Sequence, residues 1–341
     1  MKLTSVIFLI VAVVLTFPGF FICKYARGLA PNDAAIDGET IKDGQIENEI
    51  EYSDQNVSRI SMDLADCTLT IHGGANSSYV KLKNFEPNKY IGSISKKCLT
   101  VSNNISITDY LNLDGSGASF AGVWRTLRSA ILSDDITDSS VDLYISDEEE
   151  IKQISLTLSN VTLRIVGVTQ KCDISISADK SSMEFNNLTP SALKIDGDKN
   201  TISLLSVVTD KLSFEMDSAE INMRDLSADS ISLTLGEADT KIYETKFTTF
   251  SMSLKKGDTE ISTANAKSNF KRSIVTESGE IKVGKVGDGD LESIGLSDTE
   301  TNDNLPGSID IDIESGDLII RYGDDTITPE TSDKPSTAAG N

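Results

Sequence analysis

A repeat of 19 to 20 residues runs through the middle of this chain and constrains its fold more than any other feature. Each unit carries an apolar residue at one fixed position and another apolar residue nine positions later. A constant unit length predicts stacked repeats, because each unit then meets the same neighbours as the last. The first set is Leu156, Ile176, Ile195, Phe214, Leu233 and Met252, and the second is Ile165, Phe185, Leu204, Met223, Ile242 and Ile261.

Apolar and polar residues alternate within each unit, and this period of two is typical of a strand with one buried face. Hairpin loops tolerate insertions, whereas a slip of one residue would turn a stacked strand inside out. The fixed register therefore favours an all-β fold, a parallel β-solenoid with coils of 19 to 20 residues and equivalent side chains roughly 4.8 Å apart. An antiparallel β-sandwich or roll is the alternative.

The solenoid domain is expected to occupy residues 46–323. The segment "IDIDIESGDLIIRYG" at 309–323 resembles a hairpin, but its apolar spacing matches the repeat, and we interpret it as the last coil. Two interruptions are expected: a short helix at 114–132 that plugs one end of the core, and a polar surface loop at 284–308. Arg272 breaks an otherwise apolar column at a point where the spacing also slips.

The segments outside the repeat have different compositions. Residues 6–23 contain no charged residue and are long enough to span ~30 Å of hydrocarbon at ~1.5 Å per residue. A cleavable signal peptide is the rival interpretation, and we favour an uncleaved anchor over residues 1–23. Residues 24–45 would form a polar spacer, and 324–341 a disordered tail. The chain is thus expected to be a single-pass cell-membrane protein with an extracytoplasmic repeat domain.

Charge and rare residues exclude several kinds of function. The formal net charge of -22 argues against nucleic-acid binding, which needs basic side chains to neutralise phosphates. Four cysteines are scattered and His72 is the only histidine, so neither a zinc site nor a histidine-based catalytic set is expected. Cys67 and Cys98 could pair in an oxidising compartment or remain buried thiols. No enzymatic activity is expected.

No cofactor is expected either, although calcium has weak candidate ligands. Acidic residues in two expected loops supply the oxygen atoms that calcium prefers. Neither loop matches an EF-hand or a calcium-binding nonapeptide repeat, and acidic loops are usually just solvated. The candidates are Asp134, Asp135, Asp138, Asp288 and Asp290.

Several motifs together resemble a known family. They are "ISMDLADCTLTIHGG" near the start, "VDLYISDEEEIKQISLTLSNVTLRIVGV" at the entry to the repeats, and the corners "ESGEIKV" and "ESGDLII". In this order they resemble the bacterial, membrane-associated β-strand-repeat proteins called Toastrack-like, which carry an adhesin label. The resemblance covers about residues 50 to 323. It implies a membrane-tethered domain that faces outward, and it implies no catalytic residues.

Three functions remain in competition. A cell-surface structural or binding module, similar to an adhesin, fits a regular solenoid without a catalytic cluster. Its partners would be the membrane through residues 6–23 and another membrane protein, a cell-surface protein or a glycan. An accessory protein in envelope-stress sensing or signalling, acting through a membrane partner, is the alternative. A carbohydrate-active enzyme is the third candidate, and the spread of acidic residues disfavours it.

Overall fold

A computed structural model of the chain describes residues 47–52, 56–85, 90–103 and 139–323. The chain divides into two compact units, and nearly all described residues belong to the one formed by Glu49–Asn104 and Asp138–Asn341. The expected anchor, spacer, helical insert at 114–132 and tail lie outside the described residues. In the described ranges no helix is long and apolar enough to cross a membrane.

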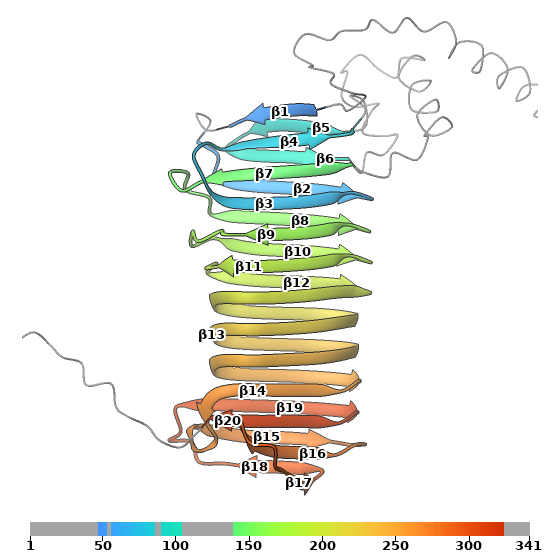
Figure 1. Cartoon of the computed structure of the whole chain (residues 1–341), viewed down its shortest axis with the longest axis vertical. Coiled ribbons are helices and arrows are strands. Elements are labelled where there is room, and N and C mark those ends of the chain that lie inside the picture. The colour runs from blue at the N-terminus through green and yellow to red at the C-terminus, as the bar shows by residue number, and fades with distance from the viewer. Residues whose placement is uncertain (1–46, 53–55, 86–89, 104–138, 324–341) are drawn as a thin grey trace, which may run out of the picture. The chain divides into compact units, whose positions relative to one another are not determined.

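Strands dominate the described chain, as the alternation of apolar and polar residues predicts (Figure 1). The first ten are β1 (Glu47–Glu51), β2 (Arg59–Ala65), β3 (Thr68–Ala75), β4 (Tyr79–Lys83), β5 (Ile91–Ser95), β6 (Cys98–Ser102), β7 (Ser140–Ser146), β8 (Gln153–Ser159), β9 (Thr162–Val166) and β10 (Asp173–Asp179). The others are β11 (Ser182–Leu188), β12 (Ala192–Asp198), β13 (Asn200–Lys256), β14 (Thr259–Ala266), β15 (Phe270–Thr276), β16 (Ile281–Lys285), β17 (Leu291–Gly295), β18 (Ser297–Glu300), β19 (Gly307–Ser315) and β20 (Leu318–Gly323). A short 3₁₀ helix, η1 (Lys267–Asn269), precedes β15.

Successive coils stack in parallel, which confirms the predicted solenoid and excludes the antiparallel sandwich. Ile176 on β10 pairs with Leu156 on β8 and with Ile195 on β12, so the partners come from consecutive units of the repeat. The second wall shows the same register, because Phe185 on β11 pairs with Ile165 on β9 and with Leu204 on β13. Strand β13 is continuous over 57 residues and winds through several coils (Figure 1).

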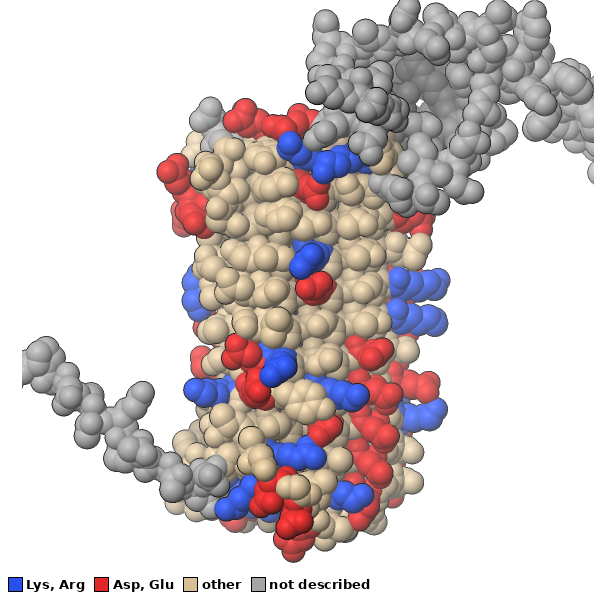
Figure 2. Space-filling view, viewed as in Figure 1, with Lys and Arg blue, Asp and Glu red and all other residues tan. Residues whose placement is uncertain are grey.

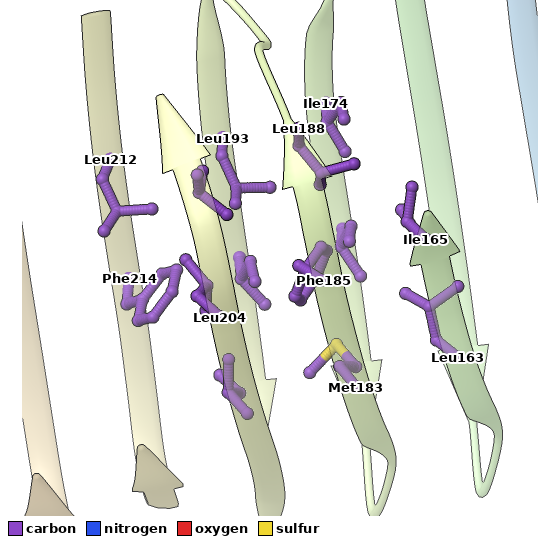
Figure 3. Close-up of a cluster of buried hydrophobic side chains, with 14 of the residues drawn as sticks. Leu163, Ile165, Ile174, Met183, Phe185, Leu188, Leu193, Leu204, Leu212 and Phe214 are labelled. Atoms are coloured by element: carbon purple, nitrogen blue, oxygen red, sulfur yellow. The ribbon is translucent and has the colours of Figure 1, made fainter. Parts of the chain in front are cut away.

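The core is a set of apolar ladders that run along the stack. Figure 3 shows side chains from neighbouring coils lying side by side, with Ile165, Phe185 and Leu204 in adjacent rungs. Met223 and Ile242, which continue this column in the sequence, are fully buried. Alternation places every second side chain inside, and the coil repeat aligns these side chains into one continuous core.

The position of segment 309–323 differs from the expectation. Ile311 on β19 pairs with Met252 on β13 on one side and with Ile274 on β15 on the other. The coil β19–β20 therefore lies between the coil that ends in β14 and the coil β15–β16, and it is not the last rung. The repeat aligns residues within coils, but it cannot reveal which coils are neighbours once the chain reverses.

The reversal occurs in residues 284–308, which are not merely a surface loop. They contain β17, which pairs antiparallel with β16, and β18, which pairs antiparallel with β15. These two short strands cover the exposed edge of the outer coil, where an open row of backbone groups would otherwise invite pairing with another chain. After them the chain returns to form the inner coil β19–β20.

The other end of the stack has the same arrangement, but there the inner coil β2–β3 comes before the outer coil β6–β7 in the chain. The coil β2–β3 pairs with β8 and β9 on one side and with β6 and β7 on the other. β4 and β5 then pair antiparallel with β7 and β6 and cover that outer coil. Both ends therefore have an inner coil, an outer coil and two antiparallel strands over it.

Candidate binding groove

A groove of about 750 Å³ runs along one corner of the stack across six coils. One side is formed by outward-facing side chains at a single position of the repeat. Their strands are hydrogen-bonded neighbours, as the pairings of Ser177 with Thr157 and with Asp196 show. With coils roughly 4.8 Å apart, the groove extends for about 24 Å. The side chains on this side are Thr157, Ser177, Asp196, Glu215, Thr234 and Ser253.

Behind the groove, the inward-facing column of the repeat lacks a large side chain in two coils. Leu158 occupies this position on β8, whereas the paired residues on the next two coils are Ala178 and Gly197. A Cβ atom on Gly197 would lie 1.7 Å from the carbonyl oxygen of Ala178, and the φ of Gly197 is +143°. Only glycine permits this approach.

A buried polar network lies directly beneath the same two coils. The Asn200 amide donates to the Ala178 carbonyl at 2.8 Å and accepts from the Ser181 backbone N–H at 2.9 Å. The Ser181 hydroxyl in turn accepts from the Val161 N–H at 3.1 Å. Asn200 and Ser181 are buried, at a corner position where Val161 is the apolar equivalent. Polar atoms thus replace apolar packing in the core behind the groove.

Charged side chains line the far side of the groove at the corner where β8, β10 and β12 end. Figure 2 shows basic side chains on the right edge of the view, with acidic side chains gathered mainly below them. Lys199 lies 2.6 Å from Asp198, and its hydrogen bond lowers the pKa of the Asp198 carboxyl. Lys180 lies 3.6 Å from Asp179. Most of the charge at this corner is therefore balanced locally.

Three charged groups of the groove stand apart from this balance. Within the described residues, Glu215, Asp217 and Lys255 have no hydrogen-bond or ion-pair partner, and all three are exposed. Glu215 and Lys255 lie two coils apart in the repeat, since Glu215 and Ser253 share one column and Lys255 follows two residues after Ser253. The groove thus offers two free carboxylates, a free ammonium group and a row of hydroxyls to a ligand.

The calcium candidates are not brought together in the described part of the chain. Asp288 and Asp290 lie in one exposed turn between β16 and β17. Asp134, Asp135 and Asp138 lie outside the described residues. No group of three or more His, Cys, Asp or Glu side chains within the described ranges could hold a metal ion.

The cysteines and the histidine have structural surroundings. Cys67, Cys98 and Cys172 are free thiols, so Cys67 and Cys98 do not form the disulfide that the sequence left open. His72 lies in β3 and stacks on Tyr144, with ring centroids 4.6 Å apart. Tyr144 stacks on Tyr79 on its other side at 4.4 Å. The imidazole therefore belongs to a column of rings on neighbouring strands.

The sequence analysis missed the groove, because its row of outward-facing polar side chains follows the ordinary alternation of a strand. The sequence did contain a signal for the buried polar network behind it. A column that holds Leu in several units changes to Ala178 and Gly197 in two consecutive units, and Asn200 follows at a corner position that is otherwise small or apolar.

Comparison with known proteins gives one family. The model of the family described as Toastrack DUF4097 matches residues 40–321. No curated protein matches the chain.

Three solved structures have 11 to 12% sequence identity to the chain. A "putative lipid binding protein" from Parabacteroides distasonis has 11% identity and a TM-score of 0.46, over 82% of this chain and 97% of that one. A "putative adhesin" from Parabacteroides merdae has 12% identity and a TM-score of 0.40, over 81% and 95%. A "putative cell adhesion protein" from Clostridium sporogenes has 11% identity and a TM-score of 0.25, over 81% and 98%.

Proposed function

The chain belongs to the Toastrack DUF4097 family, and from this premise we propose that it is a non-catalytic binding module at the cell surface. Its solenoid would be held at the outer face of the cell membrane by residues 6–23 and would present the groove to a partner on another surface. The observation that carries this proposal is the open polar groove over six coils. Such a groove suits the recognition of an extended partner.

The absence of an activated group near the groove supports a binding role over catalysis. The groove contains carboxylates, hydroxyls and lysines, and its lining includes no histidine or cysteine. Nucleophilic or general acid–base catalysis needs a base or nucleophile with a shifted pKa in a sheltered position. The one groove carboxyl with a resolved shift, Asp198, has a lowered pKa because of an exposed lysine. A lowered pKa does not suit a general acid.

Bead adhesion tests this function directly. Beads coated with the full chain are passed over isolated bacterial envelopes and over mucin-coated glass, and the retained beads are counted. We expect retention on at least one surface and no release of soluble products from it. The groove variant Thr234→Trp should lose retention, because an indole at this exposed position fills the groove. Thr201→Trp, at an exposed position on the neighbouring wall, is the matched control.

Location is tested on cells that produce the chain. Protease added to intact cells should degrade the solenoid, and the protein should sediment with membranes.

Bead retention that is equal for Thr234→Trp and Thr201→Trp would contradict the role of the groove. Release of soluble products would contradict a non-catalytic role, and full protection from external protease would contradict surface exposure.

A further inference from the structure

From the chemistry of the groove we infer that its ligand is a single chain of a neutral glycan, which lies along the stack axis. The inference rests on the proposed binding function and specifies the class of partner. It combines two features of the groove: the row of polar side chains at coil spacing and the nearly balanced charge at the rim.

The row of polar side chains suits a polymer with many hydroxyl groups. Thr157, Ser177, Thr234 and Ser253 can each donate and accept one hydrogen bond or more, and the Glu215 carboxylate accepts from hydroxyl donors. Hydrogen bonds to a charged group are stronger than those between neutral groups. Glu215 lies near the middle of the row and has no partner among the described residues, so it is free to accept from a ligand.

The geometry disfavours an extended peptide. Side chains on one face of an extended peptide recur every ~6.6 Å, whereas the coils recur every ~4.8 Å, so the two rows fall out of step within a few rungs. The backbone of the coils is also used in pairing between coils, as the neighbours β8, β10 and β12 show. A peptide on this surface would find no strand edge to extend.

Charge disfavours the polyionic alternatives. Asp198 and Asp179 are each paired with a neighbouring lysine, and Lys194 lies 3.9 Å from Asp196. Among the described residues of the groove, a polycation would find only Glu215 and Asp217 without a partner, and a polyanion would find only Lys255. A lipid tail is disfavoured as well, because the outward-facing row of the groove is polar throughout.

The test uses the full chain and defined oligosaccharides. Binding of linear gluco-, manno- and xylo-oligosaccharides is measured by a glycan array and then by calorimetry, with polylysine and polyglutamate as charged controls. At least one neutral oligosaccharide should bind, and binding should be insensitive to salt. Glu215→Ala should weaken it by about tenfold or more, as expected for the loss of a hydrogen bond to a charged group. Glu220→Ala, at an exposed position outside the groove, should leave it unchanged.

Chemical treatment of the target surface separates this inference from the proposed function. Periodate, which cleaves vicinal diols, should abolish bead retention, whereas digestion of surface proteins by protease should leave it intact. Retention that survives periodate but not protease would overturn the glycan and leave the binding function standing. Retention on no surface would overturn the binding function itself. Equal affinities of Glu215→Ala and Glu220→Ala would place the glycan outside the groove.

Discussion

At the scale of single residues, the molecule departs from its own repeat in a few places, and each departure has a compensating partner. Asn200 is buried beneath the groove, and its amide satisfies the Ala178 carbonyl and the Ser181 N–H. Arg272 is 8% exposed in a column that is otherwise apolar, and its Nε donates to Asp298 at 3.1 Å. Buried polar groups are tolerated in a core only when they are paired in this way.

Removing the Asn200 amide should destabilise the stack. Asn200→Ala leaves the Ala178 carbonyl and the Ser181 N–H without their partner, and an unsatisfied buried group costs about 1–3 kcal/mol. We expect a lower midpoint in urea unfolding with an unchanged slope. Asn222→Ala, at an exposed position on a wall, is the control and should unfold like the parent chain. A parent-like midpoint for Asn200→Ala would show that water replaces the amide.

Two thiols should react slowly. Burial raises the pKa of the Cys67 thiol from 9.0 to about 12 and that of Cys172 to about 11. Thiolate is the reactive form, so at about pH 8 both should lag behind the half-buried Cys98 in labelling by a disulfide reagent. In a chain that already carries Cys23→Ser, Cys98→Ser should remove the fast phase. A fast phase that persists in this variant would contradict the burial of the other two.

The same shifts have a consequence for stability. Because the folded pKa of each thiol is raised, the folded chain holds its proton at a pH where the unfolded chain has lost it. This contribution is complete below pH 9.0 and is lost as the pH rises toward about 11 and 12. The free energy of unfolding should therefore fall over this range, and it should fall less steeply in a Cys67→Ala, Cys172→Ala double variant.

At the scale of elements, the antiparallel strands at each end are attached by different means. β18 pairs with β15 through four residue pairs, and Asp298 on β18 meets both Arg272 and Lys267. β4 pairs with β7 at the opposite end, where Lys83 lies 2.8 Å from Asp142. The ion pair of Arg272 is buried, whereas the lysine side chain of the other pair is 42% exposed, so the two should differ in strength.

Breaking the buried pair should detach the C-terminal end. Asp298→Ala leaves the Arg272 guanidinium buried without its carboxylate, which costs about 3–5 kcal/mol. Hydrogen exchange should accelerate in β15–β18 and remain unchanged in β8–β12. A double variant, Asp298→Ala with Arg272→Ile, should recover much of the protection, because Ile309 occupies the equivalent position on β19. Uniform acceleration along the stack would contradict local detachment.

At this scale the sequence reveals the register within the repeat, but it does not reveal the order of the coils or the groove. The positions of Leu156, Ile176 and Ile195 were predictable, because register within a repeat follows from spacing and alternation alone. The neighbours of Ile311 were not, because coil order depends on a chain reversal in the weakly patterned strands β17 and β18. The groove was missed for a third reason: its outward-facing side chains are polar, as on any solvated strand face, and so they carry no distinguishing signal.

At the scale of the whole unit, the stack behaves as a one-dimensional array in which each coil is stabilised by its neighbours. Its apolar ladders are continuous from the coil β6–β7 to the coil β15–β16. The loss of one rung should therefore affect the rungs on both sides of it. Substitutions in the middle of β13 probe this cooperativity most directly, because several coils lie on either side.

Met223→Asp should unfold more than one coil. Met223 is 0% exposed, and a buried carboxylate without a partner costs several kcal/mol. Limited proteolysis should cut on both sides of residue 223, and the cooperative melting transition should shift to lower temperature and broaden. Asn222→Asp adds the same charge on the exposed neighbour and should melt like the parent. Unchanged melting of Met223→Asp would show that this column does not form the core.

The insertion of β19–β20 between two earlier coils also sets the order of events during synthesis. The coil β15–β16 leaves the ribosome before the coil β19–β20, yet β19–β20 separates it from the stack that ends in β14. Growth of the stack from the N-terminus must therefore pause at β14, with β15–β18 undocked, until the later coil arrives. A chain truncated by premature termination would lack the coil β19–β20, which joins the coil β15–β16 to the stack. It would expose β-edges that proteases and chaperones can recognise.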